Sequence, residues 1–310
     1  MDDRRDFDRR YFEIVRAWLE MRFRERDEAG CFKAHEPVYG LGRGHTEGHH
    51  CRRAIRLHDL LATVKWLGVE GSLLDVGAAE GYFPHLARTA LGLDAWASDL
   101  SREACLRAAE LFGLPAVPAN AGALPFPDDA FDVVTIAEVI EHVADPVGTL
   151  LELQRVARRF VVFSTEEWRE DEALRDHILG ARRLENHMER NIYAPSDLPV
   201  LFGGRPRVRW AQRFPVDGPE IADEVFDEAA LARLLDGRPP SVEGGTIVVV
   251  AVGEESIPEG RPSLHDPAIA AAIARNVSTP ESRLEVARGA ILERIACPLC
   301  GGRPRPRPAP

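Results

Sequence analysis

The sequence predicts an α/β protein in which a doubly wound, seven-stranded and mostly parallel sheet carries an N-terminal helical cap and a C-terminal helical tail. From Ser72 onward, short apolar runs alternate with segments of helical spacing, which is the pattern of repeated strand and helix units. The first apolar run, 73–76, leads into a turn of small residues. The composition, 45% hydrophobic and 29% charged, is that of a globular chain with a large core.

The individual elements follow from the periodicity. Apolar residues three and four positions apart predict helices over 7–23 and 54–67, ahead of the first strand. The expected strands are 73–76, 95–98, 116–118, 131–137, 160–163, 208–216 and 246–252. Helices are expected over 82–91, 102–111, 146–156, 195–201, 217–236 and 280–295, and Ser101 and Asp145 are the predicted N-caps of two of them.

This pattern divides the chain into three regions. Residues 1–69 are predicted to be N-terminal helices that cap the substrate, 70–253 the core with a helical insertion or lid at 168–202, and 254–310 a linker, a helix and a disordered tail rich in Pro and Arg. The apolar runs are much shorter than the roughly 18 residues of a membrane span, so we expect no membrane segment and a cytoplasmic location. The net charge of −11 disfavours nucleic acid as a partner, since it repels a polyanion.

The segment from Leu73 to Phe83 carries the clearest signal for a bound ligand. An apolar strand leads into small residues at 77, 79 and 81 and then into a helix, so the backbone can approach a ligand at the carboxyl edge of the sheet. Position 82 is Tyr, where the dinucleotide fingerprint has its third Gly. Asp75 stands at the strand end, and Asp99 ends the next strand, where a carboxylate can accept hydrogen bonds from both ribose hydroxyls.

Together with the segments 122–134 and 138–143, this region resembles the class I S-adenosylmethionine (SAM) dependent methyltransferases, which have a Rossmann-like fold. The resemblance covers residues 70–165 and extends more loosely to 253. It implies that Asp75 anchors the methionine amino group of SAM and that Asp99 binds the ribose. The other implied cofactor contacts are Gly77, Ala78, Ala79, Gly81, Leu100, Asn120, Ala121 and Glu138.

Two positions depart from the family pattern. Ala79 replaces the commonest Gly, which a tight turn accepts provided that its φ is negative. Asn120 stands where an acidic residue often receives the adenine amino group, and its amide carbonyl retains an acceptor for that contact.

The segment after the fourth strand supplies the candidate catalytic residues. SAM already carries an activated methyl group, so the protein must align the acceptor, exclude water and, for some acceptors, remove a proton. His142, with Glu138 nearby, is the candidate base because histidine titrates near neutrality. In the family the same segment often only shapes this loop and contacts the cofactor. With His187, the residues Glu138, Glu141 and His142 also resemble a Mg²⁺ or Mn²⁺ site of terminal-ribose RNA methyltransferases.

Two further clusters lie outside the region of resemblance. The N-terminal helices commonly close over the active site in this family, so Tyr39, Arg43, His45, His49 and the later His187 are candidate substrate contacts. Cys297 and Cys300 have the spacing of a zinc half site. A second cysteine pair is missing, so another chain or distant residues complete the site, or it stays empty.

These observations predict a SAM-dependent methyltransferase that acts on an oxygen or nitrogen atom of a small molecule such as a natural-product or sugar-like intermediate. Three alternatives stay open. The first is a divalent-metal-dependent methyltransferase of RNA ends or catechol-type substrates. The second is a non-catalytic SAM-fold subunit that binds a partner, with homodimerisation or a protein contact through the C-terminal tail, and the third is an NAD oxidoreductase.

Overall fold

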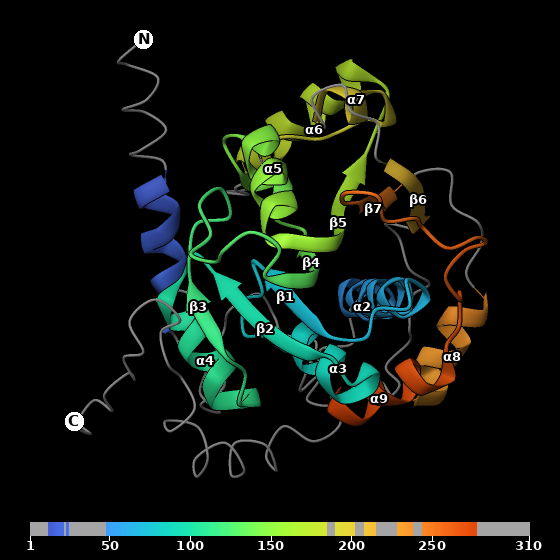
Figure 1. The fold of residues 1–310 in the computed structure, drawn as a ribbon. Helices are drawn as coiled ribbons and strands as arrows, with labels where there is room; N and C mark the ends of the chain where they lie inside the picture. Colours follow the sequence, from blue (N-terminus) through green and yellow to red (C-terminus); the bar gives the residue numbers. More distant parts are fainter. Residues whose placement is uncertain are drawn as a thin grey trace, which may run out of the picture.

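The computed structural model describes residues 12–21, 23–24, 48–184, 190–201, 208–214, 228–237 and 244–277. In these ranges, seven strands form one sheet in the order β3-β2-β1-β4-β5-β7-β6 (Figure 1). The strands are β1 (Ser72–Val76), β2 (Asp94–Asp99), β3 (Ala116–Pro118), β4 (Phe131–Ala137), β5 (Ala157–Trp168), β6 (Val208–Phe214) and β7 (Gly244–Ala251). Strands β1 to β5 pair in parallel, and β7 runs antiparallel to both β5 and β6. The predicted α/β fold with a mostly parallel sheet is confirmed.

Helices cover both faces of this sheet, as Figure 1 shows. They are α2 (Gly48–Trp66), α3 (Tyr82–Leu91), α4 (Arg102–Phe112), α5 (Pro146–Val156), α6 (Glu172–Leu184), α7 (Leu198–Leu201), α8 (Glu228–Gly237) and α9 (Pro267–Val277), with short 3₁₀ turns η2 (Ile140–His142) and η3 (Pro195–Asp197). Residues 12–21 form a further helix. The predicted bounds of α3 and α5 are confirmed, as are both N-caps. Ser101 accepts a hydrogen bond from the backbone N–H of Ala104, and Asp145 from that of Gly148.

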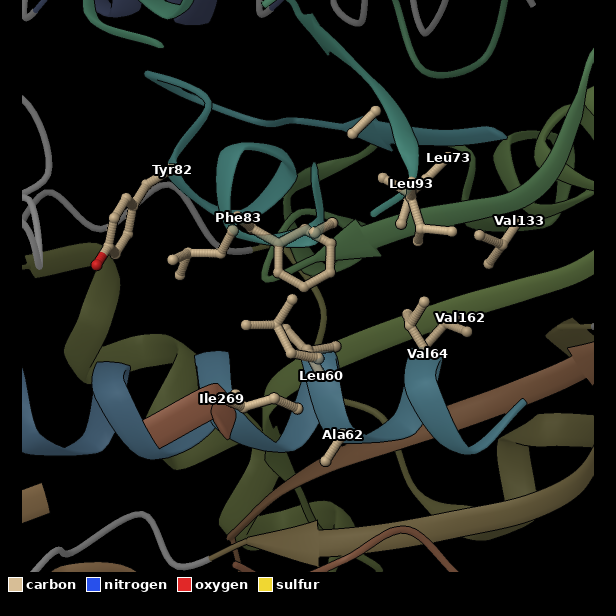
Figure 2. Close-up of a cluster of buried hydrophobic side chains, with 14 of the residues drawn as sticks. Leu60, Ala62, Val64, Leu73, Tyr82, Phe83, Leu93, Val133, Val162 and Ile269 are labelled. Atoms are coloured by element: carbon tan, nitrogen blue, oxygen red, sulfur yellow. The ribbon is translucent and has the colours of Figure 1, made fainter. Parts of the chain in front are cut away.

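The core has two layers because successive strand residues point to opposite faces. Leu73 and Val133 belong to the cluster that faces α2, α3, α8 and α9, whereas the adjacent Leu74 and Val134 belong to the cluster that faces α5 and α7. Near-continuous apolar strands are expected when both faces of a parallel sheet are covered. Figure 2 shows Val64 of α2 beside Val162 of β5.

The helix α2 is part of this core. Its residues between Ala54 and Leu67 pack with β1, α3 and α9 in one buried cluster, and Figure 2 shows Leu60 below the ring of Phe83. Residues 54–67 therefore belong to a core helix, because its apolar stripe packs against the sheet. A role of residues 1–69 in capping the substrate stays a prediction. Arg56, near the amino-terminal end of α2, reaches Glu138, which follows the carboxyl end of β4.

The helix α9 also belongs to the core, although the sequence analysis placed a linker before residue 267 and no helix over 267–277. Ile269 and Ile273 are buried in the same cluster as α2. Asp266 caps α9 by accepting from the N–H groups of Ala268 and Ile269, and its own N–H donates to Nε2 of His58 over 2.8 Å. The Nζ of Lys65 donates to the Asp266 carboxylate over 2.5 Å. The end of the described chain is thereby tied to α2.

Candidate cofactor site at the carboxyl edge of the sheet

The loop between β1 and α3 contains the small residues that the sequence analysis selected. Gly77 has φ 76° and Gly81 φ 80°, a region that glycine enters without a steric cost. A Cβ on Gly77 would overlap the side chain of Val139, and one on Gly81 would lie 2.7 Å from Cδ1 of Leu114. The N–H groups of Gly77 and Ala78 both donate to the carbonyl of Ser98, which holds the loop against the end of β2. Glycine is therefore required at 77 and 81 by both backbone angle and space.

Ala79 differs from the prediction made for it. Its φ is 48°, in the left-handed region, so it does not meet the condition of a negative φ under which the turn was expected to accept alanine. For a residue with a Cβ this conformation costs roughly 1–2 kcal/mol. The N–H of Ala79 donates to Oδ2 of Asp99 over 2.9 Å, which offsets part of that cost. The ribose-binding candidate Asp99 thus also fixes the loop.

Asp75 and Asp99 are two buried carboxylates at the ends of β1 and β2. Asp75 accepts a hydrogen bond from Oγ1 of Thr135 over 2.6 Å, and burial together with the charge of Asp99 raises its pKa to about 7. Asp99 accepts from the N–H of Ser101 over 2.8 Å, and burial raises its pKa to about 6. Two buried acids in this state favour a ligand that brings a positive charge, because a cation lowers their pKa.

Glu138 follows β4 directly and adopts φ 56°. Oε1 of its carboxylate accepts from Oγ of Ser164 over 2.8 Å, and Oε2 pairs with Nη1 of Arg56 over 2.9 Å. This network ties the end of β4 and the adjacent part of β5 to α2. Arg56 was missed by the sequence analysis because a helical arginine 82 positions from its partner carries no local signal. Glu138 is consequently held as an ion pair, an arrangement that suits positioning better than proton transfer.

The 3₁₀ turn η2 carries Glu141 and His142, and a later segment holds it in place. The carbonyl of Glu141 accepts from the backbone N–H groups of Arg190 and Asn191. The side chain of Asn191 donates to the carbonyls of Glu141 and Val143. Tyr193 donates its hydroxyl to the carbonyl of Ile140 over 2.9 Å. Asn191 and Tyr193 are further residues that the sequence analysis did not select, and together they fix the backbone that flanks His142.

The proposed Mg²⁺ or Mn²⁺ set does not assemble among the described residues. In that part of the chain, no three His, Cys, Asp or Glu side chains come together in a way that could hold a metal ion. Glu138 is paired with Arg56, and Glu141 is almost fully buried. The three members of the set that the structure describes, Glu138, Glu141 and His142, are therefore not arranged as a ligand group.

The predicted adenine contacts lie on the loops after β2 and β3. Leu100 and Ala121 are half-buried, whereas Asn120 is exposed. Oδ1 of Asn120 accepts from the N–H of Gly122 over 3.0 Å, so this side chain closes its own turn. One lone pair of that oxygen and both amide hydrogens remain for a ligand.

Several predicted site residues lie outside the part of the chain that the structure describes. They are Tyr39, Arg43, His45, His187, Cys297 and Cys300, together with the helix expected over 280–295 and the Pro/Arg tail. His49 lies in α2, but its side chain is not among those described. Roles in substrate or zinc binding stay predictions for these residues.

The chain is similar in sequence to known methyltransferases. Residues 74–163 match the family described as methyltransferase domain. An uncharacterized methyltransferase of Mycolicibacterium vanbaalenii is 35% identical over 157 residues, which cover 46% of this chain and 60% of that relative. The ubiquinone/menaquinone biosynthesis C-methyltransferase UbiE of Stenotrophomonas maltophilia is 43% identical over 65 residues, 19% of this chain and 26% of the relative. Magnesium protoporphyrin IX methyltransferase of Synechocystis, solved with bound S-adenosylhomocysteine, has a TM-score of 0.47 and 11% identity over 66% of this chain and 88% of its own.

The sequence matches and the arrangement of the site indicate the same class of protein. Over residues 74–163 the chain is similar to the class I SAM-dependent methyltransferases, with a glycine loop after β1 and acidic residues at the ends of β1 and β2. The match to the M. vanbaalenii relative spans less than two thirds of that protein.

Proposed function

We propose that the protein transfers the methyl group of SAM to an oxygen or nitrogen atom of a small-molecule acceptor, of a natural-product or sugar-like kind. The observation that supports this proposal most directly is the juxtaposition of the Gly77–Gly81 loop with the buried carboxylates of Asp75 and Asp99. SAM carries a positive amino group, two ribose hydroxyls and an adenine, and the residues at this edge match each of these groups in turn.

The contribution of each residue follows from its surroundings. Asp75 would pair with the ammonium group, which relieves the cost of burying its charge. The two oxygens of Asp99 accept from the backbone N–H groups of Ala79 and Ser101, and the N–H of Leu100 also stabilises the charged form. A carboxylate can accept about four hydrogen bonds, so it retains acceptor capacity for a ribose hydroxyl. When bound, SAM supplies a methyl group on a positively charged sulfur. The chain then has to hold the acceptor in line with that methyl group and exclude water.

Proton removal is assigned to His142 for acceptors that need it. Its backbone N–H donates to the carbonyl of Val139, and Asn191 fixes the carbonyls of the residues on either side. A fixed backbone gives a base a defined position, which general base catalysis requires. Glu138, whose charge is neutralised by Arg56, would shape the site beside the cofactor.

A small acceptor fits the charge of the protein better than a nucleic acid does. The net charge of −11 repels a polyanion at long range. In the described ranges, no helix is both long and apolar enough to cross a membrane. A cytoplasmic location, a homodimer and a partner bound through the C-terminal tail remain predictions.

Calorimetric titration with S-adenosylhomocysteine, the product of the reaction, tests the proposal. The native chain should bind it, and Asp99→Asn should weaken binding at least about tenfold because a charge-assisted hydrogen bond is lost. Asp94→Asn is the matched control, because Asp94 is exposed at the opposite end of the same strand. Binding that is absent in the native chain, or unchanged in Asp99→Asn, would refute the assignment.

Methyl transfer from labelled SAM to a panel of small hydroxyl and amine acceptors then tests the reaction. Activity that survives a chelator is expected. Activity that is abolished by the chelator and restored by Mg²⁺ would support the metal-dependent alternative. A chain that binds S-adenosylhomocysteine but methylates nothing in the panel would favour a non-catalytic subunit.

A further inference from the structure

The helix formed by residues 12–21 lies at the amino end of α4, next to the loop that follows β2. Its Glu20 carboxylate accepts three hydrogen bonds there: from Oγ of Ser101 over 3.1 Å, and from the N–H groups of Arg102 over 2.8 Å and Glu103 over 3.0 Å. These backbone N–H groups belong to the first turn of α4. The N–H groups of a first turn have no carbonyl partner within their own helix. A negative side chain in this position also interacts favourably with the helix dipole.

Phe23 follows this helix and lies against the cofactor loop. Its side chain is 1% exposed and is clustered with Ala104 of α4, with Leu19 and with Ala79 of the loop. Ala79 is the residue with a left-handed backbone. We call residues 12–21 with Phe23 and Arg24 the N-terminal clamp. The clamp therefore packs against the strained position of the loop.

Arg107 of α4 contacts both the clamp and the loop between β1 and α3. Its Nη1 donates to the carbonyl of Phe23 over 2.8 Å, and its guanidinium lies over the Phe23 ring, 5.6 Å from the centroid. The same guanidinium forms a buried ion pair with Glu80, the loop residue after Ala79. A planar guanidinium with five donors can serve two partners in different directions, which an ammonium group cannot do in the same geometry.

We propose that the N-terminal clamp is a wall of the cofactor site on its ribose side, with Glu20, Phe23 and Arg107 as positioning residues for the Ala79–Glu80 segment and for Asp99. This inference rests on the proposed binding of SAM. Glu20 fixes the start of α4, and therefore Ser101, whose N–H holds one oxygen of Asp99. Phe23 and Arg107 hold Ala79 and Glu80, and the N–H of Ala79 holds the other oxygen of Asp99. Both oxygens of the ribose-binding carboxylate thus depend on contacts of the clamp.

This role differs from the one expected for the N-terminal region. Residues 1–69 were expected to cap the substrate, whereas the clamp touches the loop and the helix on the ribose side of the site. Loss of the clamp should therefore weaken the binding of ligands that contain ribose. Ligands that engage only the methionine side, at Asp75, should not be affected.

The test compares S-adenosylhomocysteine, adenosine and L-methionine in calorimetric titrations of the full chain. Phe23→Ala should lower the affinities for S-adenosylhomocysteine and for adenosine by the same factor, about tenfold, because one oxygen of Asp99 loses its fixed position. The affinity for L-methionine should stay the same. Phe23→Leu should restore most of the loss, since it refills the space between Ala79 and Ala104. Ile14→Ala is the matched control on the same helix, because Ile14 is 61% exposed and should change none of the three affinities.

Two further measurements separate positioning from general loss of structure. Hydrogen exchange of a peptide spanning 77–82 should rise in ligand-free Phe23→Ala, while exchange in β4 and β5 stays as in the native chain. Glu20→Gln, which keeps the shape of the side chain but removes its charge, should weaken adenosine binding in a chain that stays folded at the assay temperature. Phe23→Ala and Glu20→Gln are therefore the two variants that test the clamp.

The outcomes are distinguishable. If the native chain binds S-adenosylhomocysteine but folded Phe23→Ala and Glu20→Gln bind it and adenosine within twofold of native affinity, the clamp inference is wrong and the proposed function stands. An equal loss of affinity for all three ligands would also overturn the clamp inference, because that result indicates a general defect in the fold. If the native chain binds none of them, both proposals fail.

Discussion

Replacing Asp75 with asparagine tests the electrostatics of the site most sharply. Burial raises the pKa of Asp75 from its usual 3.8 to about 7, so the folded chain holds this proton more tightly than the unfolded chain does. The free energy of unfolding must then fall as the pH rises between these two values, because the unfolded state ionises first. Each pKa difference of one corresponds to about 1.4 kcal/mol, which gives an upper limit of about 3 kcal/mol lost between pH 5 and pH 8.

In Asp75→Asn this contribution is absent, since the amide does not titrate. The difference in free energy of unfolding between variant and native chain should therefore grow by up to about 3 kcal/mol, in favour of the variant, from pH 5 to pH 8. Urea unfolding of the ligand-free chains at several pH values measures it. A difference that is independent of pH would refute the reasoning.

Ligand binding should respond in the opposite direction. An ammonium group binds the ionised form of Asp75, so the affinity of the native chain for S-adenosylhomocysteine should fall as the pH drops below 7. In Asp75→Asn the affinity should be lower by a factor of about 100 or more at pH 8, as expected when one partner of a buried pair is removed. Titrations in two buffers of different ionisation enthalpy should detect proton release from the native chain alone.

Three other predictions concern the loop, the ion pair and the turn η2. Gly77→Ala should destabilise the chain by more than the roughly 1–2 kcal/mol cost of a positive φ, because its Cβ also overlaps a side chain; Gly92→Ala, with a similar φ and open space, is the control in urea unfolding. Arg56→Met should cost about 1.5–3 kcal/mol by leaving Glu138 unpaired. Adding Glu138→Gln should recover part of that cost, and strict additivity of the two changes would contradict the pair. Asn191→Ala should lower the free energy of unfolding by about 1–2 kcal/mol and raise hydrogen exchange over 138–143, and unchanged exchange there would argue against its role.

Much of the fold could be predicted from local sequence signals. The helices α3 and α5 have their predicted bounds because apolar spacing, N-caps and glycine or proline boundaries act over a few residues. The helix α9 was missed, since Pro267 was interpreted as the end of a linker and not as a first helical residue. The extension of β5 to Trp168 was also missed, because Glu166 and Glu167 interrupt the apolar run and the strand continues past them by pairing Trp168 with β7.

The site was predictable only in part, for a related physical reason. The loop after β1 and the acidic residues at the two strand ends can be recognised from a few neighbouring residues in the sequence. The Arg56–Glu138 pair and the contacts of Asn191 join positions far apart in the chain, so no spacing encodes them. The left-handed backbone of Ala79 depends on Asp99 and Phe23, which surround it in space only.

Because α9 packs on α2, the core layer around α2 can be completed only late in synthesis. The bond from the N–H of Asp266 to His58 closes a loop of 208 residues, and Ile269 and Ile273 fill the layer that α2 helps to build. Until residue 277 has left the ribosome, the apolar stripe of α2 lacks one of its neighbours, while β1 to β5 already have theirs. A nascent chain stalled after β7 should therefore expose this stripe and bind chaperones, and a chain extended through α9 should release them.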